Sequence, residues 1–148
     1  MTDKPKLDFV TMPLNPYSLG MTVEFLSRFP PFASFELSPL VNAISFQLGT
    51  GSNLLASKND EIVAYLGWVP TTIPVAKAWM RSGELLTPAD NGDAVAITIM
   101  ATSDPAIMLS LIRTAKSRHS YTNVYWRRYF QDNRGERMRS LERRTTEG

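Results

Sequence analysis

Hydrophobic and polar positions along this chain first follow the spacing of helices and then that of strands. In "TVEFLSRF" (residues 22–29) apolar side chains recur at helical spacing before a Pro-Pro step, which predicts a short helix. Residues 38–49 predict a second helix, with Ser38 as N-cap, Pro39 at the first helical position and Gly49 at its end. Two helices are therefore expected before the first hairpin.

A β-hairpin is the natural interpretation of the next segment. Two runs rich in apolar residues, 53–57 and 61–69, flank the turn sequence Lys58-Asn59-Asp60. Residues 71–83 then predict a helix with a threonine cap, Pro74 in its first turn and a terminal glycine. This helix would return the chain to the sheet.

The remaining segments predict a strand, a helix and a second strand. Residues 93–101 are apolar and β-branched, as in a buried strand. The following helix is expected to be capped by Ser103, with Pro105 just inside its start, and the aromatic run at residues 121–130 predicts another strand. Residues 136–144 suit a strand and a helix equally well.

This order of elements predicts one α/β domain at residues 21–144, with a mixed, largely antiparallel central sheet flanked by helices. The first twenty residues are polar and contain several prolines, so a partly disordered tail is expected at residues 1–20. A chain of 148 residues is long enough for one core.

Composition excludes several classes of chemistry. The chain has no cysteine and a single histidine, and no loop gathers Asp and Glu, so we predict no disulfide, no metal and no bound cofactor. No apolar run approaches the roughly 18 residues of a membrane span, and no secretory signal pattern opens the sequence. A soluble, cytoplasmic protein is expected.

Positive charge concentrates in the C-terminal third, although the formal net charge is only +2. Arg127, Arg128, Arg137 and Arg139 are the candidate partner-binding residues, for an acidic protein or for a nucleic acid. The commoner explanation of such arginines is the solvent-exposed face of a strand or helix. The aromatic run "VYWRRYF" offers base stacking or a dimer edge, against the alternative of a half-exposed sheet face.

The corner at residues 102–105 raises the question of an anion site. A helix that begins directly after a central strand directs its free backbone N–H groups beyond the strand end. Asp104, however, places a carboxylate at this helix start, where it favours the helix dipole and would repel a phosphate. Structural capping is the preferred interpretation, and none of the glycine-rich phosphate-binding motifs occurs in the chain.

His119 is the only side chain with an unperturbed pKa near neutrality, so a histidine base could only be this residue. Its place at a helix end also suits a simple interaction with the helix dipole. Asp93 is the second weak catalytic candidate. The aromatic residues Tyr65 and Trp68 stand where aromatic side chains usually belong to the core, and lining a binding pocket is the less common alternative.

With these elements in place, the chain resembles the RTX toxin-activating lysine acyltransferases, a family with a GNAT-like α/β fold. The resemblance covers roughly residues 37–140. It is carried by the following stretches: "IVAYLGW" (Ile62 to Trp68), the helix with "AKAW", "NGD" (Asn91 to Asp93), the apolar strand ending in "MATS", and the arginine-bearing strand that leads to Gly135.

The resemblance implies transfer of a fatty acyl group from acyl carrier protein to a lysine. The family uses a histidine of the N-terminal segment and an aspartate in the strand after the Gly-Asp step. Here "EFLSRFPPFASFEL" contains no histidine, and Ile99 stands at about the position of the aspartate.

Three functions follow as hypotheses. The first is an acyltransferase-like protein with a pocket near Tyr65, Trp68, Thr98 and Ser103 and with acyl carrier protein or another acyl donor as partner. The second is a non-catalytic binding or regulatory module that keeps the GNAT-like fold and has lost the catalytic histidine and aspartate. The third is a nucleic-acid binder, whose affinity would fall steeply with salt.

Overall fold

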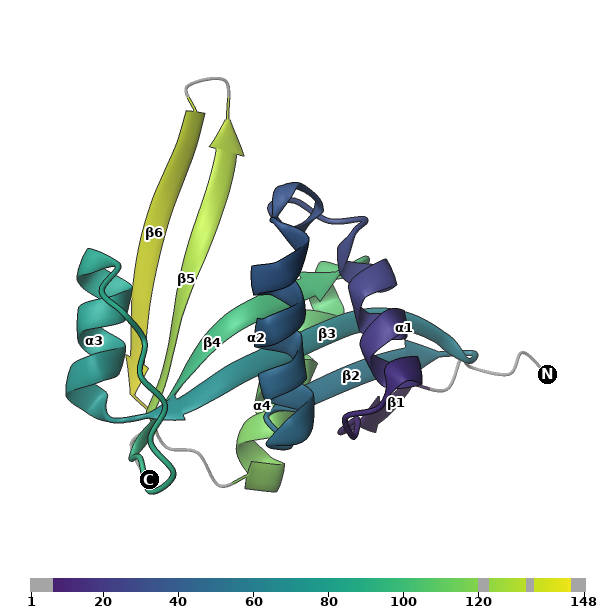
Figure 1. Ribbon diagram of the computed structural model, residues 1–148, viewed down its shortest axis with the longest axis horizontal. Coiled ribbons are helices and arrows are strands. Elements are labelled where there is room, and N and C mark those ends of the chain that lie inside the picture. The colour runs from purple at the N-terminus through teal and green to yellow at the C-terminus, as the bar shows by residue number, and fades with distance from the viewer. Residues whose placement is uncertain (1–6, 120–122, 133–134, 145–148) are drawn as a thin grey trace. The chain divides into compact units, whose positions relative to one another are not determined.

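The computed structural model describes residues 7–119, 123–132 and 135–144, with side chains up to Trp126. Its elements are β1 (Leu7–Val10), α1 (Pro16–Leu26), η1 (Phe32–Ser34), α2 (Leu37–Gly49), β2 (Asn53–Lys58), β3 (Glu61–Thr71), α3 (Ile73–Ser82), β4 (Ala94–Thr102), α4 (Pro105–His119), β5 (Asn123–Asp132) and β6 (Gly135–Arg144) (Figure 1).

The strands are hydrogen-bonded in the order β1-β2-β3-β4-β5-β6. The pairs β1/β2, β2/β3 and β5/β6 are antiparallel, and β4 pairs with β5 in parallel. The chain is therefore a single α/β domain with a mixed, largely antiparallel sheet flanked by helices, as the sequence predicts. Residues 136–144, which suited a strand and a helix equally, lie in β6.

The hairpin of β2 and β3 confirms the prediction from the sequence. Asn59 and Asp60 both have positive φ, 53° and 64°, and Lys58 pairs with Glu61. Two consecutive left-handed residues make the two-residue turn whose twist matches that of the flanking strands. Asn and Asp are the non-glycine residues that adopt this conformation most readily.

The N-terminal segment is more regular than the sequence suggested. β1 pairs with β2 from Leu7↔Lys58 to Val10↔Leu55. Asn15 then caps α1, since its Oδ1 accepts from the backbone N–H of Ser18 at 2.8 Å. Residues 7–10 and 16–20, expected in a partly disordered tail, therefore belong to regular elements.

Two helix starts also differ from the predicted ones. α1 begins at Pro16 and not at residue 22, because the Asn15 cap and the proline at the first helical position start it earlier. α2 begins at Leu37, and the predicted Ser38 cap is wrong. Its first helical hydrogen bond runs from Leu40 N to Glu36 O at 3.3 Å, so the residue before the helix is Glu36.

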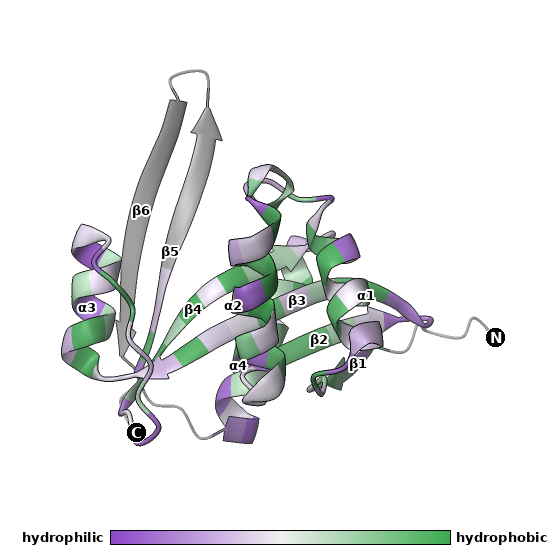
Figure 2. Ribbon diagram, in the orientation of Figure 1, coloured by the Kyte–Doolittle hydropathy of each residue, from purple (hydrophilic) through white to green (hydrophobic). Residues whose placement is uncertain are grey.

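The chain forms two compact units, Met1–Gly67 with Ile99–Arg118 and Trp68–Thr98 with His119–Gly148. In the first unit, α1 and α2 lie on one side of β2 and β3, and α4 lies on the other side (Figure 1). Hydrophobic residues run along β2 and α2 (Figure 2). The first four residues of β2 are all buried, as expected for a strand with both faces covered.

The core of this first unit joins helices α1 and α2 to the sheet. Its buried members are Phe25, Leu26, Phe32, Leu40, Ile44, Leu48, Leu55, Tyr65, Ile99 and Ala101.

The second unit contains α3. Both caps that the sequence predicts for this helix are confirmed. The Thr72 side chain accepts from Val75 N at 3.4 Å, and Gly83 ends the helix with φ 67°. Ala76 and Met80 of α3 form a smaller core cluster with Ala94 of β4 and Tyr125 of β5. This cluster holds α3 on the sheet.

Candidate functional site

The corner between β4 and α4 is held to the neighbouring strand by its own backbone. The N–H of Ser103 donates to Val63 O at 3.0 Å, and the Ser103 hydroxyl donates to the same oxygen at 3.3 Å. The N–H of Asp104 donates to Thr102 Oγ1 at 3.0 Å. The Thr102 hydroxyl has one hydrogen for two acceptors in reach, Val63 O at 3.0 Å and Asp104 O at 2.8 Å.

The first turn of α4 is capped by Asp104. Its Oδ1 accepts from Ala106 N at 3.0 Å, and its carbonyl oxygen accepts from Ile107 N at 3.0 Å. Pro105 has no N–H to donate. The prediction that Ser103 caps this helix is therefore wrong, because the Asp104 carboxylate reaches the first free amide while the Ser103 hydroxyl is directed to Val63.

Ser103 and Tyr65, two of the predicted substrate-binding residues, lie in the first unit and differ in exposure. Ser103 is exposed, whereas Tyr65 is fully buried and its hydroxyl donates to Gln47 Oε1 at 3.0 Å. Gln47 is also fully buried. Tyr65 thus belongs to a polar contact inside the core, between α2 and β3.

Alkaline pH should reveal this burial. Burial raises the pKa of the Tyr65 phenol above its ordinary value of about 10. The unfolded chain therefore loses this proton first. The stabilising contribution is complete below pH 10 and is lost as the pH rises towards the raised pKa, by up to about 1.4 kcal/mol per pH unit.

The measurement is urea unfolding of Tyr65→Phe and of the unsubstituted protein between pH 7 and pH 11. At pH 7 the variant should be less stable by about 1 kcal/mol, the usual value of one hydrogen bond. This difference should shrink above pH 10, because phenylalanine has no proton to lose. Parallel pH profiles of the two proteins would contradict the assignment.

In the second unit, Trp68 and His119 are in direct contact. Their ring centroids lie 5.2 Å apart at an interplanar angle of 69°, an edge-to-face arrangement. Trp68 is buried and His119, the last residue of α4, is half-buried. The structure thus brings one predicted catalytic residue against one predicted substrate-binding residue.

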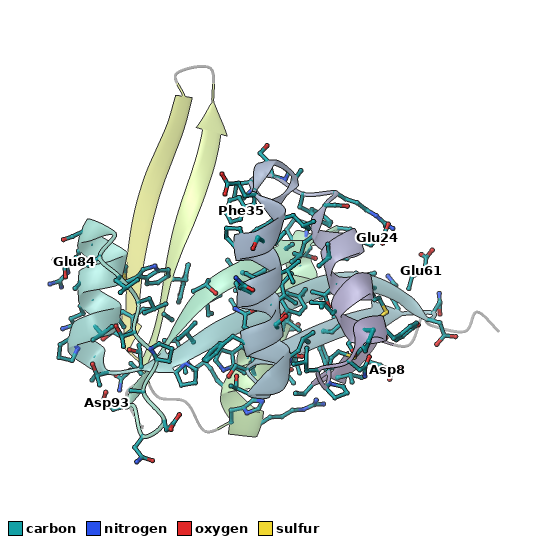
Figure 3. All side chains as sticks on the ribbon, viewed as in Figure 1. Asp8, Glu24, Phe35, Glu61, Glu84 and Asp93 are labelled. Atoms are coloured by element: carbon teal, nitrogen blue, oxygen red, sulfur yellow. The ribbon has the colours of Figure 1, made fainter. Side chains whose placement is uncertain are left out.

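Asp93 and Thr98 complete the candidates of the second unit. Asp93 is exposed, and its Oδ1 accepts from Ile73 N at 3.0 Å, at the start of α3 (Figure 3). Its carbonyl oxygen accepts from Asn123 Nδ2 at 2.8 Å. Asp93 therefore stabilises the α3 start, where a carboxylate favours the helix dipole. Thr98 is half-buried in β4.

The four candidate arginines can be placed only by their backbone. In the register of β5 and β6, Arg128 pairs with Arg139, Arg127 with Ser140, and Phe130 with Arg137. Their side chains lie outside the described part of the structure.

Sequence reasoning missed Gln47 and Gly67, which meet in the first unit. A Cβ at Gly67 would overlap Gln47 Oε1 and lie 2.8 Å from Nε2. The available signal was a glutamine one residue before Leu48, on the apolar side of a helix. A polar residue at such a position has to find a partner inside the core.

The described residues also bear on metal and membrane chemistry. Nowhere among them do three or more His, Cys, Asp or Glu side chains gather as metal ligands would. None of the described helices has both the length and the apolar character needed to cross a membrane.

Several solved structures share this arrangement of elements. The GphF GNAT-like decarboxylase in complex with isobutyryl-CoA matches with a TM-score of 0.60 and 16% identity, over 86% of this chain and 67% of that one. The loading GNATL domain of CurA from Lyngbya majuscula gives a TM-score of 0.62 and 9% identity, over 87% and 68%. This chain has a GNAT-like fold. The GNAT-like prediction is thereby confirmed.

A third structure of this fold is a diaminobutyrate acetyltransferase, EctA from Paenibacillus lautus, in complex with L-2,4-diaminobutyric acid and coenzyme A. Its TM-score is 0.55 at 10% identity, over 85% of this chain and 68% of that one. Comparison with protein-family models and with curated proteins gives no match.

Proposed function

We propose that this GNAT-like protein is acyltransferase-like and binds an acyl donor. The observation that carries the proposal is the fold, because two structures that share it are complexes with isobutyryl-CoA and with coenzyme A. The first of these ligands is an acyl thioester, and the second is the thiol that remains after an acyl group has left. The substrate class is therefore proposed to be a thioester-activated acyl group.

Acyl transfer to an amine needs a base for the amine proton and a group that stabilises the oxyanion. In this proposal His119 is the base, because imidazole takes up a proton near neutral pH. Asp93 is the weaker candidate, since its Oδ1 already accepts from Ile73 N. Trp68, in contact with His119, and Thr98 are proposed to contact the acyl group.

The finer proposal concerns the donor and the family. In keeping with the resemblance to the toxin-activating lysine acyltransferases, the donor is proposed to be acyl carrier protein. Attraction between the basic C-terminal third and an acidic carrier would mainly raise the association rate. This chain differs from that family because its N-terminal segment has no histidine and because Ile99 stands at about the position of the aspartate. Acyl transfer therefore has to be tested separately from donor binding.

Native mass spectrometry of the protein with fatty-acyl carrier protein, with and without a lysine-bearing acceptor, tests the proposal. We expect a complex with the carrier and a mass increment of one acyl chain on the protein or on the acceptor. If neither acyl carrier protein nor acyl-CoA binds, the acyltransferase-like proposal is wrong.

Two variants separate the chemistry of His119 from its packing. His119→Phe retains an aromatic ring beside Trp68 but cannot take up a proton, so transfer should be lost while the fold is kept. His119→Ala should lose transfer as well. Transfer that persists in His119→Phe would assign the base elsewhere.

The second candidate function is a non-catalytic module that binds an acyl donor or its carrier. The observation that favours it is the Asp93 contact, because a carboxylate that stabilises the start of α3 is not free to act as a base. Binding of the acylated carrier with no acyl transfer under any condition would select this function.

A further inference from the structure

The backbone of the β4–α4 corner offers no free hydrogen-bond donor. From residue 103 to residue 107, every backbone N–H donates to an acceptor of the protein itself, and Pro105 has none. A helix start binds phosphate through such free N–H groups. The corner therefore lacks the donors that a pyrophosphate would need.

The charge of the corner points the same way. Asp104 is half-buried, and its carboxylate oxygen accepts from Ala106 N at the positive end of the α4 dipole. This carboxylate occupies the place and supplies the charge that an anionic ligand would supply. A phosphate would have to displace it and would meet a like charge at close range.

The shape of the corner adds a third argument. Phosphate-binding loops before a helix contain glycines, which let the backbone approach the ligand closely. Residues 100–107 contain no glycine. Both Thr102 and Ser103 lie within hydrogen-bond distance of Val63 O, so the corner is fixed to β3. The residues at this corner do not fit the pyrophosphate of coenzyme A.

We infer that Asp104 is a specificity-determining residue that keeps the pyrophosphate of a nucleotide-bearing donor out of the β4–α4 corner. The donor is then an acyl thioester recognised through its acyl chain and pantetheine arm, the part that a carrier protein presents. This inference rests on the proposed function, because it assumes that an acyl donor binds.

Isothermal titration calorimetry with octanoyl-CoA and octanoyl-pantetheine tests the inference. The unsubstituted protein should bind both thioesters with affinities that agree within about threefold, since phosphate contacts add little. Asp104→Asn keeps the helix cap and removes the charge. The affinity for octanoyl-CoA should therefore rise about threefold relative to the affinity for octanoyl-pantetheine. A double variant, Asp104→Gly with Pro105→Gly, frees amides and should raise this preference to about tenfold.

The matched control is Asp60→Asn in the β2–β3 turn. It changes the net charge by the same amount at an exposed carboxylate, and asparagine tolerates the positive φ of 64° there. This control should leave the ratio of the two affinities unchanged. An equal gain in Asp60→Asn would assign the effect to overall charge and contradict the role of Asp104.

The remaining outcomes are distinct. A tenfold or greater preference of the unsubstituted protein for octanoyl-CoA would overturn the inference while leaving the proposed function intact. Equal binding of both thioesters by every variant would remove Asp104 as the determinant. If neither thioester binds any of these proteins, the proposed function itself fails, and the inference fails with it.

Discussion

Gly92→Ala should destabilise the protein by about 3 kcal/mol, the upper range for an added methyl group in a packed site. A Cβ at Gly92 would overlap the carbonyl oxygen of Thr71 and lie 2.5 Å from its carbonyl carbon. Both partners in this contact are backbone, so neither can turn away. The φ of Gly92 is not positive, so the effect comes from the lack of space for the methyl group and not from backbone strain.

The surroundings leave little room for adjustment. Thr71 is fully buried, and its hydroxyl donates to Thr87 O at 2.7 Å. Ala89 N donates to Pro70 O at 2.9 Å, so the loop before β4 is fixed along the end of β3. A displaced Gly92 would also move the adjacent Asp93 and its contact with the α3 start.

Thermal unfolding measures this effect, and a fall in Tm of about 10 °C is expected. Gly20→Ala is the control, because Gly20 lies in α1 with nothing within 4 Å of an added Cβ. That change should instead stabilise by about 0.8 kcal/mol through the better helix propensity of alanine. A Gly92→Ala variant as stable as the unsubstituted protein would show that the loop can move away from Thr71.

Gly67→Ala should cost about 2 to 3 kcal/mol through a different partner. The new methyl group would overlap the amide of Gln47, which accepts from the Tyr65 hydroxyl inside the core. The overlapping atoms belong to the Gln47 side chain, which can rotate away from the new methyl group. That rotation leaves the buried Tyr65 hydroxyl without its acceptor. The cost is therefore mainly a lost buried hydrogen bond.

A double-mutant cycle with Gln47→Ala isolates this contact. Each single change should destabilise, but the double variant should be more stable than the sum of the two losses by about 1 to 2 kcal/mol. The reason is that alanine at residue 47 vacates the space that the methyl group needs. Additive losses, measured by urea unfolding, would place the cost of Gly67→Ala elsewhere.

Elements with local signals could be predicted from the amino-acid sequence. The Asn59-Asp60 turn, the Thr72 and Gly83 caps of α3, and the apolar run of β4 each carry their signal within a few residues. Their order was enough to predict an α/β domain with a mixed sheet, and the fold resemblance followed from it. The Asn15-Pro16 cap of α1 was an equally local signal that sequence reasoning did not use.

Features that depend on residues far apart in the chain could not be predicted from the sequence. β1 is four residues long and pairs with β2 more than forty residues later. Asn53 holds the chain beyond β1, since its side chain accepts from Met12 N at 2.8 Å and donates to Met12 O at 3.1 Å. A strand this short forms because its partner strand satisfies its backbone, which no pattern within residues 7–10 reveals.

The candidate site likewise combines contacts that are local in the sequence with contacts between distant residues. The acceptors of the Asp104, Ala106 and Ile107 N–H groups are Thr102 and Asp104, which are local in the sequence. The Ser103 N–H instead donates to Val63 O, in a residue of β3 forty positions earlier. The contact of Trp68 with His119 likewise joins residues far apart in the chain. Neighbouring residues satisfy the N–H groups at the start of α4, whereas the attachment of this corner to β3 depends on a partner that only the folded chain brings near.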